Sequence, residues 1–289
     1  MKHIKIEKDV PQIIIRLFAA VACTRVGITI MIIINRHFKI TIRMRGVRYY
    51  FKLLDPSNII ALSEIFARGV YSIFLPEPNW TIVDAGSNIG GFVLWVNDIL
   101  NENCKIIAIE PEPNNFNVLS ANVKDNKISN VILYNSALGD SCGFCIVKNE
   151  GGHSKIEPVN IAPTDVDLVS TENDKLIRSN TRCDYGNIIR IITIDSILSE
   201  MKLRHVDLIK IDVEGSEYKL LVGAKHALES RSITRIIMET HSEELHYECK
   251  NYLSTIGYRI LLSKWFGNYK TGMLAAILPP IRDIKKGEH

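Results

Sequence analysis

The sequence has little excess charge of either sign. Its 289 residues include 35 lysines and arginines against 32 aspartates and glutamates, which gives a formal net charge of +3. A nucleic-acid-binding protein usually concentrates positive charge on one face, because it must neutralise phosphates. The near balance of positive and negative charge therefore does not indicate a nucleic-acid partner. It favours a small or neutral molecule as the substrate.

The chain also lacks a long uncharged apolar run. The segment 11–35 is rich in isoleucine, valine and alanine, but Arg16 and Arg25 interrupt it and its longest uncharged stretch is Val26–Asn35. A membrane-spanning helix needs about 20 apolar residues, so a crossing is not expected. A signal peptide is not indicated either, because no clean small-residue cleavage site follows. We expect a packed or interfacial helix, with contact to a membrane surface as the alternative.

Cysteines are few and scattered. The six lie at positions 23, 104, 142, 145, 183 and 249 of a chain in which 46% of residues are hydrophobic, enough to build a sizeable core without disulfides. Reduced thiols and a cytoplasmic location, peripheral to a membrane at most, are therefore expected. Cys142 and Cys145 have the spacing of metal ligands, but a structural zinc site needs two more ligands and no second pair supplies them. No metal site is predicted.

The most informative feature that is present is a strand, a glycine turn, a helix and a second strand that ends in an acid. Thr81–Val83 suits a buried parallel strand, Gly86 permits a tight turn after it, and Gly90 lets helix and ligand approach closely. Glu110 lies twenty positions after Gly90, where an acid can accept hydrogen bonds from both ribose hydroxyls of a nucleotide-like ligand. This order predicts a site for a ligand that contains adenosine.

The glycine spacing differs from the common dinucleotide pattern. The order is Gly86-x-x-x-Gly90-Gly91 rather than G-x-G-x-x-G. Asp84 ends the first strand and places a carboxylate where a pyrophosphate would be repelled and an amino-acid ammonium attracted. S-adenosylmethionine carries such an ammonium. The plain alternative is an ordinary tight turn in another doubly wound α/β protein.

A second strand followed by acids lies further along the chain. Val206–Glu217 contains an apolar run and then Asp212 and Glu214. Here the sequence resembles the FkbM family of S-adenosylmethionine-dependent methyltransferases. The resemblance covers roughly residues 82–257 and rests on four segments in the right order: Val83–Gly90, Ile109–Pro111, Thr193–Ser196 and Leu208–Glu217.

The resemblance implies a fold, a cofactor and a reaction class. The fold is a seven-stranded Rossmann-like sheet of order 3-2-1-4-5-7-6 with helices on both faces. The cofactor is S-adenosylmethionine, and the reaction is O-methylation of a sugar, a glycan or a related small metabolite. Residues after the third strand would border the adenine. The expected cofactor contacts are Asp84, Gly86, Asn88, Gly90, Glu110, Ser136, Ala137, Leu138 and Asp212.

The hydrophobic pattern itself indicates alternating strands and helices. It predicts helices at 90–100, 113–127 and 216–229 and from Ser242. It predicts strands up to 109 and at 131–134, 207–211, 234–239, 258–262 and 273–278, the last two antiparallel. Residues 1–75 are expected to form an N-terminal extension made of the apolar helix, a β-hairpin within 38–52 and a covering helix that begins near Asp55 and ends at Gly69. Residues 76–289 are expected to form the methyltransferase domain.

Between Asn135 and Ile188 the periodicity fails, and so long a connection is usually functional or disordered. Residues 142–147 and 188–193 are predicted to pair as antiparallel strands, with an acceptor lid between them. His153 and Ser154 are the candidate substrate contacts there, and His153 is a candidate base. A loop histidine exposed to water is the simpler alternative.

Methyl transfer to an alcohol requires an aimed oxygen and a group that removes its proton. Four polar residues follow predicted strand ends, where open α/β sheets bind their ligands, and are the candidate catalytic residues: Asp212, Glu214, Glu239 and His241. Each has another possible role. Asp212 can bind the methionine ammonium, Glu214 and Glu217 can cap the next helix, and Glu239 can pair with Lys210.

Two other functions fit parts of this pattern. A nicotinamide-dependent oxidoreductase could use the same architecture, although the glycine spacing and the missing Tyr-x-x-x-Lys pair argue against it. A non-catalytic protein could keep the cofactor pocket while the basic hairpin and the apolar segment dock a partner or a membrane. The intact motifs favour the enzyme.

Overall fold

A computed structural model describes residues 2–9, 38–44, 47–51, 62, 64–150, 153–159, 168–169, 177–178, 180–181 and 188–280. The predicted apolar helix at 11–35 and the predicted start of the covering helix at Asp55 lie outside these residues. No helix in the described part of the chain combines the length and the apolar character that crossing a membrane requires.

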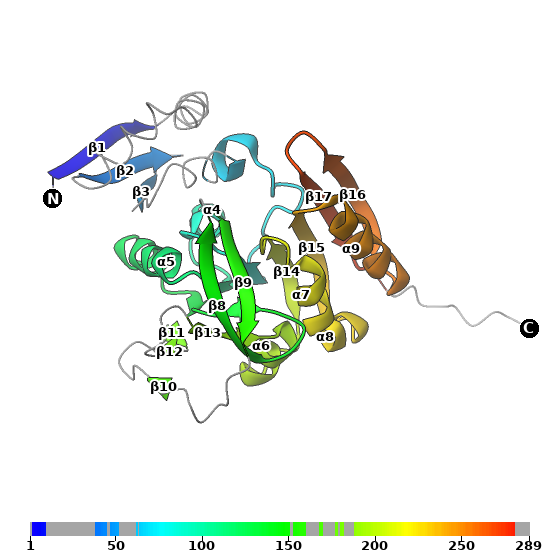
Figure 1. Cartoon of the computed structure of the whole chain (residues 1–289). Helices are drawn as coiled ribbons and strands as arrows, with labels where there is room; N and C mark the ends of the chain where they lie inside the picture. The colour runs from blue at the N-terminus through cyan, green and yellow to red at the C-terminus, as the bar shows by residue number, and fades with distance from the viewer. Residues whose placement is uncertain are drawn as a thin grey trace, which may run out of the picture.

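One large sheet forms the centre of the molecule (Figure 1). Its neighbouring strands follow the order β6, β5, β4, β14, β15, β17, β16, and the two-residue strand β11 (Ile177–Arg178) extends it beyond β6. β17 is antiparallel to both of its neighbours. The predicted order 3-2-1-4-5-7-6 is therefore confirmed. The strands are β4 (Thr81–Ala85), β5 (Lys105–Ile109), β6 (Val131–Tyr134), β14 (Val206–Ile211), β15 (Ile233–Thr240), β16 (Arg259–Phe266) and β17 (Thr271–Ile277).

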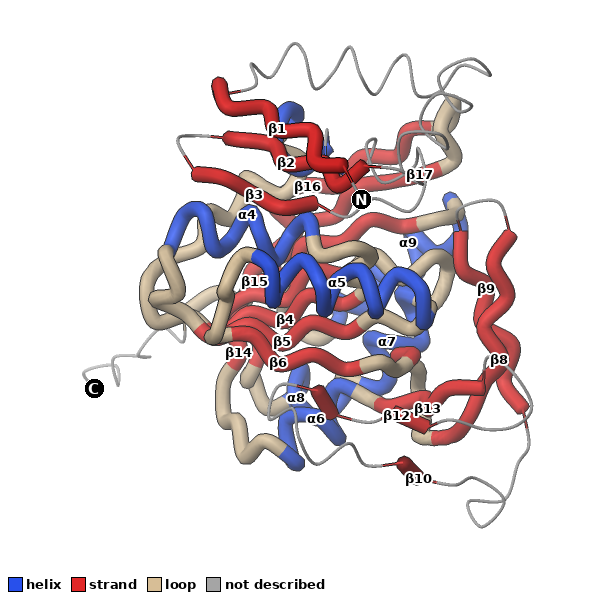
Figure 2. Tube along the Cα trace, turned by 90° about the vertical axis from the view of Figure 1, so that its left-hand side faces the viewer, coloured by secondary structure: helices blue, strands red, loops and turns tan. Residues whose placement is uncertain are grey.

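Helices cover both faces of this sheet (Figure 2). Successive residues of a strand point to opposite faces, so Ile82 joins the core beneath α4 (Gly91–Leu100) and α5 (Pro113–Asp125), while Val83 joins the core on the other face. That second core is covered by α6 (Ile194–Glu200), α7 (Glu217–Gly223), α8 (Lys225–Glu229) and α9 (Glu243–Thr255).

The predicted helix at 216–229 is wrong in one respect, because it is divided at Ala224 into α7 and α8. Gly223 passes so close to another turn that a Cβ placed on it would lie 2.0 Å from the carbonyl oxygen of Gly139. The other helices and strands predicted within residues 76–289 are present, with ends that differ by a few residues.

A smaller sheet follows β6, in the order β7 (Ala137–Leu138), β13 (Ile188–Ile192), β8 (Gly143–Glu150) and β9 (His153–Val159). β8 and β13 are antiparallel, which confirms the pair predicted there. Two short strands, β10 (Leu168–Val169) and β12 (Asn180–Thr181), pair with each other in the remaining segment.

The N-terminal part contains a separate three-stranded sheet. β2 (Phe38–Met44) and β3 (Val47–Phe51) form the predicted hairpin, and β1 (Lys2–Asp9), which was not predicted, pairs in parallel with β2. The covering helix ends as a π-helical turn at Glu64–Arg68, and Gly69 stops it with a φ of 63°. Phe66 and Tyr71 belong to the same core as α4. The boundary at residue 75 stays a prediction.

Candidate active site

The turn between β4 and α4 is held by close backbone packing. Gly86 has a φ of 80°, and a Cβ added to it would lie 1.8 Å from the carbonyl oxygen of Asp212. The backbone N–H groups of Gly86 and Ser87 both donate to the carbonyl oxygen of Ile109 at 3.0 Å. Only glycine fits this position, because the turn touches the ends of two neighbouring strands at once.

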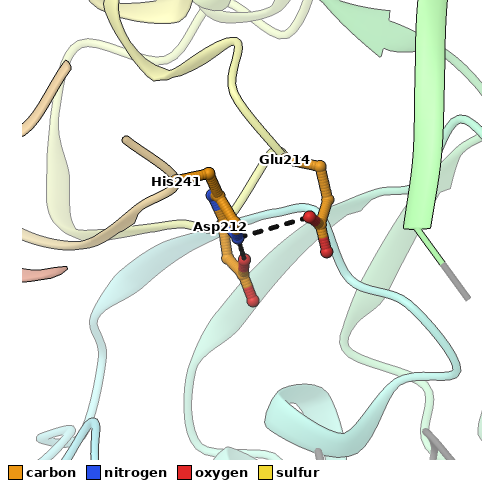
Figure 3. Close-up of side chains that lie close together, drawn as sticks. All are labelled: Asp212, Glu214 and His241. Atoms are coloured by element: carbon orange, nitrogen blue, oxygen red, sulfur yellow. Dashed lines mark ion pairs between the residues drawn. The ribbon is translucent and has the colours of Figure 1, made fainter. Parts of the chain in front are cut away.

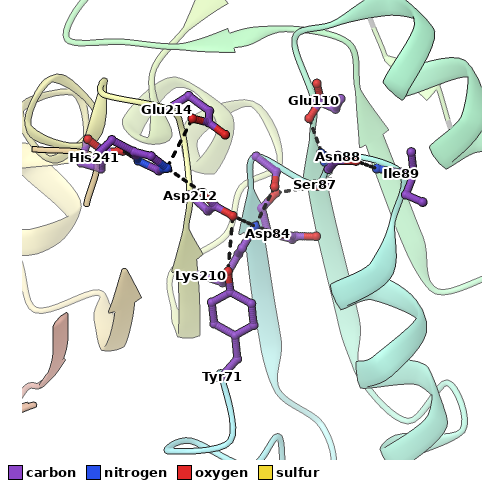
Figure 4. Close-up of polar contacts among 12 residues, drawn as sticks. Tyr71, Asp84, Ser87, Asn88, Ile89, Glu110, Lys210, Asp212, Glu214 and His241 are labelled. Carbon is purple, nitrogen blue, oxygen red and sulfur yellow. Dashed lines mark hydrogen bonds and ion pairs between the residues drawn. The ribbon is translucent and has the colours of Figure 1, made fainter. Parts of the chain in front are cut away.

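Glu110 is fixed at the end of β5 by backbone donors (Figure 4). One carboxylate oxygen accepts from the N–H of Asn88 at 2.8 Å, and the other accepts from the N–H of Glu112 at 3.0 Å. Burial raises the pKa of Glu110 to about 7, although these hydrogen bonds lower it. The side chain is therefore held at both carboxylate oxygens and lies where the sequence predicts a ribose acceptor.

Asp84 lies beneath the turn rather than on the pocket surface. It is completely buried, and the Lys210 ammonium lies 3.2 Å from it and 3.5 Å from Asp212. Lys210 also donates to the carbonyl oxygen of Gly86 at 2.6 Å. Burial raises the pKa of Asp84, against the lowering effect of Lys210. Lys210 thus connects β4, β14 and the glycine turn. The predicted pairing of Lys210 with Glu239 is not among its ion pairs in the described residues.

Sequence reasoning missed Tyr71. Its hydroxyl donates to the carboxylate of Asp212 at 3.3 Å, and the Lys210 ammonium lies 5.6 Å from the centre of its ring. Burial, and then the charge of Asp212, raise the pKa of Tyr71 well above its ordinary value. No motif marks Tyr71, because it reaches the site from the segment that precedes β4.

The strand ends of β14 and β15 bring three predicted residues together (Figure 3). Nε2 of His241 lies 3.3 Å from Glu214 and 3.6 Å from Asp212. Nδ1 of His241 lies 2.7 Å from Glu217, whose side chain is completely buried and also accepts from the N–H of Gly215. Burial lowers the pKa of His241, but the hydrogen bond to Glu217 and the charges of Asp212 and Glu214 outweigh it and raise the pKa to about 9.

Glu239 is the fourth predicted catalytic residue and lies in β15, two residues before His241. Burial, followed by the negative charge of Asp212, raises the pKa of Glu239 to about 8, while His241 opposes the shift. Glu239 does not line the neighbouring pocket. It contributes to the charge of the strand ends but is poorly placed to touch an acceptor.

A pocket that is open to solvent joins the two regions. Six predicted cofactor contacts line it, whereas Asp84, Gly90 and Ala137 do not. The lining also includes Ile156 of β9, which was not predicted. The lining residues are Gly86, Asn88, Ile109, Glu110, Pro111, Asn115, Ser136, Leu138, Ile156, Asp212, Val213 and Glu214.

The predicted substrate contacts lie in the hairpin beside this pocket. His153 and Ser154 are residues of β9 and pair with Glu150 and Asn149 of β8. Their side chains lie outside the described part of the structure, and Ile156, two residues further along, reaches the pocket. The β8–β9 hairpin is therefore close to the site, as the expected lid would be.

Comparison with known proteins agrees with this arrangement. A family model described as Methyltransferase FkbM domain matches residues 84–260. Methyltransferase sdnD of Sordaria araneosa is 30% identical over 181 residues, which cover 55% of this chain and 66% of that protein. Hexuronic acid methyltransferase AglP of Haloferax volcanii is 28% identical over 166 residues, which cover 57% of this chain and 58% of that protein. The matches thus span about three-fifths of these relatives.

Among solved structures, M. jannaschii TYW2 in complex with AdoMet aligns with a TM-score of 0.42 and 15% identity. The alignment covers 82% of this chain and 84% of that one. A likeness this distant does not bear on the reaction.

Proposed function

This chain belongs to the FkbM methyltransferase family, and on that premise we propose that it transfers a methyl group from S-adenosylmethionine to a hydroxyl of a sugar, a glycan or a related small metabolite. The observation that carries the proposal is the position of Glu214, which lines the pocket and lies 3.3 Å from His241. The similarity to a hexuronic acid methyltransferase supports a sugar as acceptor.

The pocket offers a place for each part of the cofactor. The ribose hydroxyls would donate to Glu110, and the adenine would lie against Leu138 beside Ser136. The methionine ammonium and the sulfonium would face Asp212, since a positively charged ligand is favoured beside a carboxylate. Asp84 supports this end indirectly, because Lys210 links it to Asp212.

Glu214 is the group that we assign as proton acceptor. In the transfer the acceptor oxygen bonds to the methyl carbon, the carbon–sulfur bond breaks, and sulfur keeps the electron pair. The hydroxyl proton moves to the Glu214 carboxylate as the new bond forms. Glu217 holds the ring of His241 through Nδ1, and Nε2 of the same ring faces Glu214, so the carboxylate is oriented before the acceptor arrives.

Calorimetric titration with S-adenosylmethionine, S-adenosylhomocysteine and NAD tests the cofactor. Selective binding of the two sulfur ligands is expected. Binding of NAD alone would identify an oxidoreductase and overturn the proposal, and binding without turnover on any acceptor would indicate a cofactor-binding protein instead.

A screen of sugars and uronic acids with methyl-labelled cofactor tests the acceptor. The expected product is an ether that survives mild alkali. A label released by alkali would reveal an ester, formed on a carboxylate that needs no base, and would contradict the assignment of a hydroxyl. Full activity of Glu214→Gln on a hydroxyl acceptor would contradict the assignment of Glu214 as the base. His153 would then be the next candidate.

A further inference from the structure

We propose that Asp212, Glu214 and His241 bind a divalent cation at the mouth of the pocket. One ligand atom from each residue lies within 4.8 Å of the other two, and no other such group of histidine, cysteine or acidic side chains occurs in the described part of the chain. Cys142 and Cys145, whose spacing raised the question of zinc, are not part of it. The role given to the ion below rests on the proposed function, but its binding does not.

The distances between the ligand atoms suit a single ion. Nε2 of His241 lies 3.3 Å from the Glu214 oxygen and 3.6 Å from the Asp212 oxygen. Ligands bonded at about 2.1 Å to one ion are separated by about 3.0–3.4 Å at octahedral or tetrahedral angles. Both separations from Nε2 are therefore within a few tenths of an ångström of these values, and the two carboxylate oxygens lie within 4.8 Å of each other. Figure 3 shows both carboxylates directed to the same nitrogen.

The second observation is the buried carboxylate behind His241. Glu217 is completely buried, and its oxygen lies 2.7 Å from Nδ1 of His241. Metal-binding histidines commonly donate their other ring nitrogen to a carboxylate, which fixes the ring and leaves one nitrogen free for the metal. Here the bond to Nδ1 leaves Nε2 facing Asp212 and Glu214. The second oxygen of Glu217 has no hydrogen-bond partner among the described residues.

The charge of the region also favours a cation. Three carboxylates, those of Asp212, Glu214 and Glu217, surround one imidazole. Lys210 lies 3.5 Å from Asp212, and it is shared with the buried carboxylate of Asp84. One nitrogen and two carboxylate ligands suit ions such as Mn²⁺, Fe²⁺ or Zn²⁺, which accept both imidazole and oxygen, better than an all-oxygen ion such as Ca²⁺.

Such an ion would act on the acceptor. Protein ligands from three side chains leave coordination positions free, and a sugar hydroxyl bound there becomes more acidic. The hydroxyl proton would pass to the Glu214 carboxylate as the acceptor oxygen bonds to the methyl carbon, and sulfur would keep the electron pair of the broken carbon–sulfur bond. The ion would fix the acceptor at the end of the pocket occupied by the sulfonium.

Binding of Mn²⁺ to the full chain, freed of metal with a chelator, tests the inference. Paramagnetic resonance measures free Mn²⁺ during the titration, and calorimetry gives the stoichiometry. We expect one ion per chain, and at least tenfold weaker binding in Glu214→Gln and in His241→Ala. Glu217→Gln, a positioning change, is expected to weaken binding by about 10- to 100-fold.

Two exposed residues supply matched controls. Glu244→Gln and His226→Ala make the same chemical changes on helices outside the cluster, and both are expected to bind Mn²⁺ as the unaltered chain does. Circular dichroism and S-adenosylhomocysteine binding show that each variant is folded.

Absence of saturable Mn²⁺ binding to the unaltered chain, with Zn²⁺ also failing, would overturn the inference. Equal binding by the cluster variants and the controls would do the same, because the ion would then lie elsewhere. Methyl transfer that persists in excess chelator would leave the proposed function intact and overturn the role given to the ion in the reaction. If Mn²⁺ binds at the cluster but neither S-adenosylmethionine nor S-adenosylhomocysteine binds, the metal site would be supported and the proposed function would be contradicted.

Discussion

The two sides of the pocket are built in different ways. The glycine-turn side, from Gly86 to Glu110, is held by backbone N–H groups and close packing. The strand-end side, from Asp212 to His241, is held by charged side chains that meet across two strands. Figure 4 shows them facing each other, with Lys210 and Asp84 between them.

This difference separates recognition from chemistry. Backbone donors and a buried carboxylate have one geometry and suit a cofactor that is always the same. Partly exposed charges at strand ends can exchange protons or hold an ion, and their positions depend on one another. We therefore expect substitutions on the first side to change cofactor binding. On the second side we expect substitutions of Glu214 and His241 to change turnover, whereas Asp212 also faces the cofactor.

The largest effect is expected where the two sides touch. Gly86→Ala places a Cβ 1.8 Å from the carbonyl oxygen of Asp212, in a backbone conformation with φ of 80°. We expect a loss of more than about 3 kcal/mol in the free energy of unfolding, measured by urea denaturation, together with loss of S-adenosylhomocysteine binding. Gly143→Ala is the control, because nothing lies within 4 Å of its added Cβ. Equal stability of the two variants would show that the turn relaxes easily.

The sequence was sufficient to predict the glycine-turn side because strand, turn, helix and acid follow one another within thirty residues. Gly86, Asn88 and Glu110 all line the pocket. Asp84 was placed at the right strand end, but its burial could not be foreseen, since this depends on Lys210 from a strand more than a hundred residues away. Local pattern thus locates a residue along a strand and does not say what covers it.

The strand-end side was predicted only as a set of separate candidates. Asp212, Glu214 and His241 each follow an apolar run, yet their meeting, and the role of Glu217 in holding the ring, come from the pairing of β14 with β15. Tyr71 and Ile156 were missed because they reach the site from segments without a motif. The division of the 216–229 helix at Ala224 was not predicted either.

The next effect concerns turnover on the strand-end side. Glu214→Gln removes the assigned proton acceptor while keeping the shape of the side chain, so we expect turnover to fall by about 100-fold or more. The Kd of S-adenosylhomocysteine should change by less than about threefold, because an interaction used only in the reaction leaves binding of the cofactor product intact. The exposed Glu244→Gln serves as the control. A parallel loss of affinity and turnover would show that the two sides are not separate.

Glu110→Ala examines the opposite side of the comparison. The variant loses charged hydrogen bonds to the ribose, and we expect S-adenosylmethionine binding to weaken by roughly 1.5–3 kcal/mol, which is about 10- to 150-fold in Kd. Calorimetry measures this change, and urea denaturation shows whether the variant is folded. Unchanged affinity in a folded variant would remove Glu110 from the ribose site.

The smallest expected effect is the pH dependence that Glu110 gives to cofactor binding. Burial raises the pKa of Glu110 to about 7. Ribose hydroxyls donate to the ionised carboxylate, so the pKa falls in the complex and binding releases a proton. Affinity for S-adenosylhomocysteine should therefore rise with pH until about 7 and then level off, being about tenfold weaker at pH 6 than at pH 8. Glu110→Gln cannot titrate and should lose this dependence, whereas any contribution from Glu239 would remain in both proteins. If the affinity of Glu110→Gln changes with pH as steeply as that of the unaltered chain, the pH dependence would come from the strand-end side. The pKa of Glu239 there is also raised, to about 8.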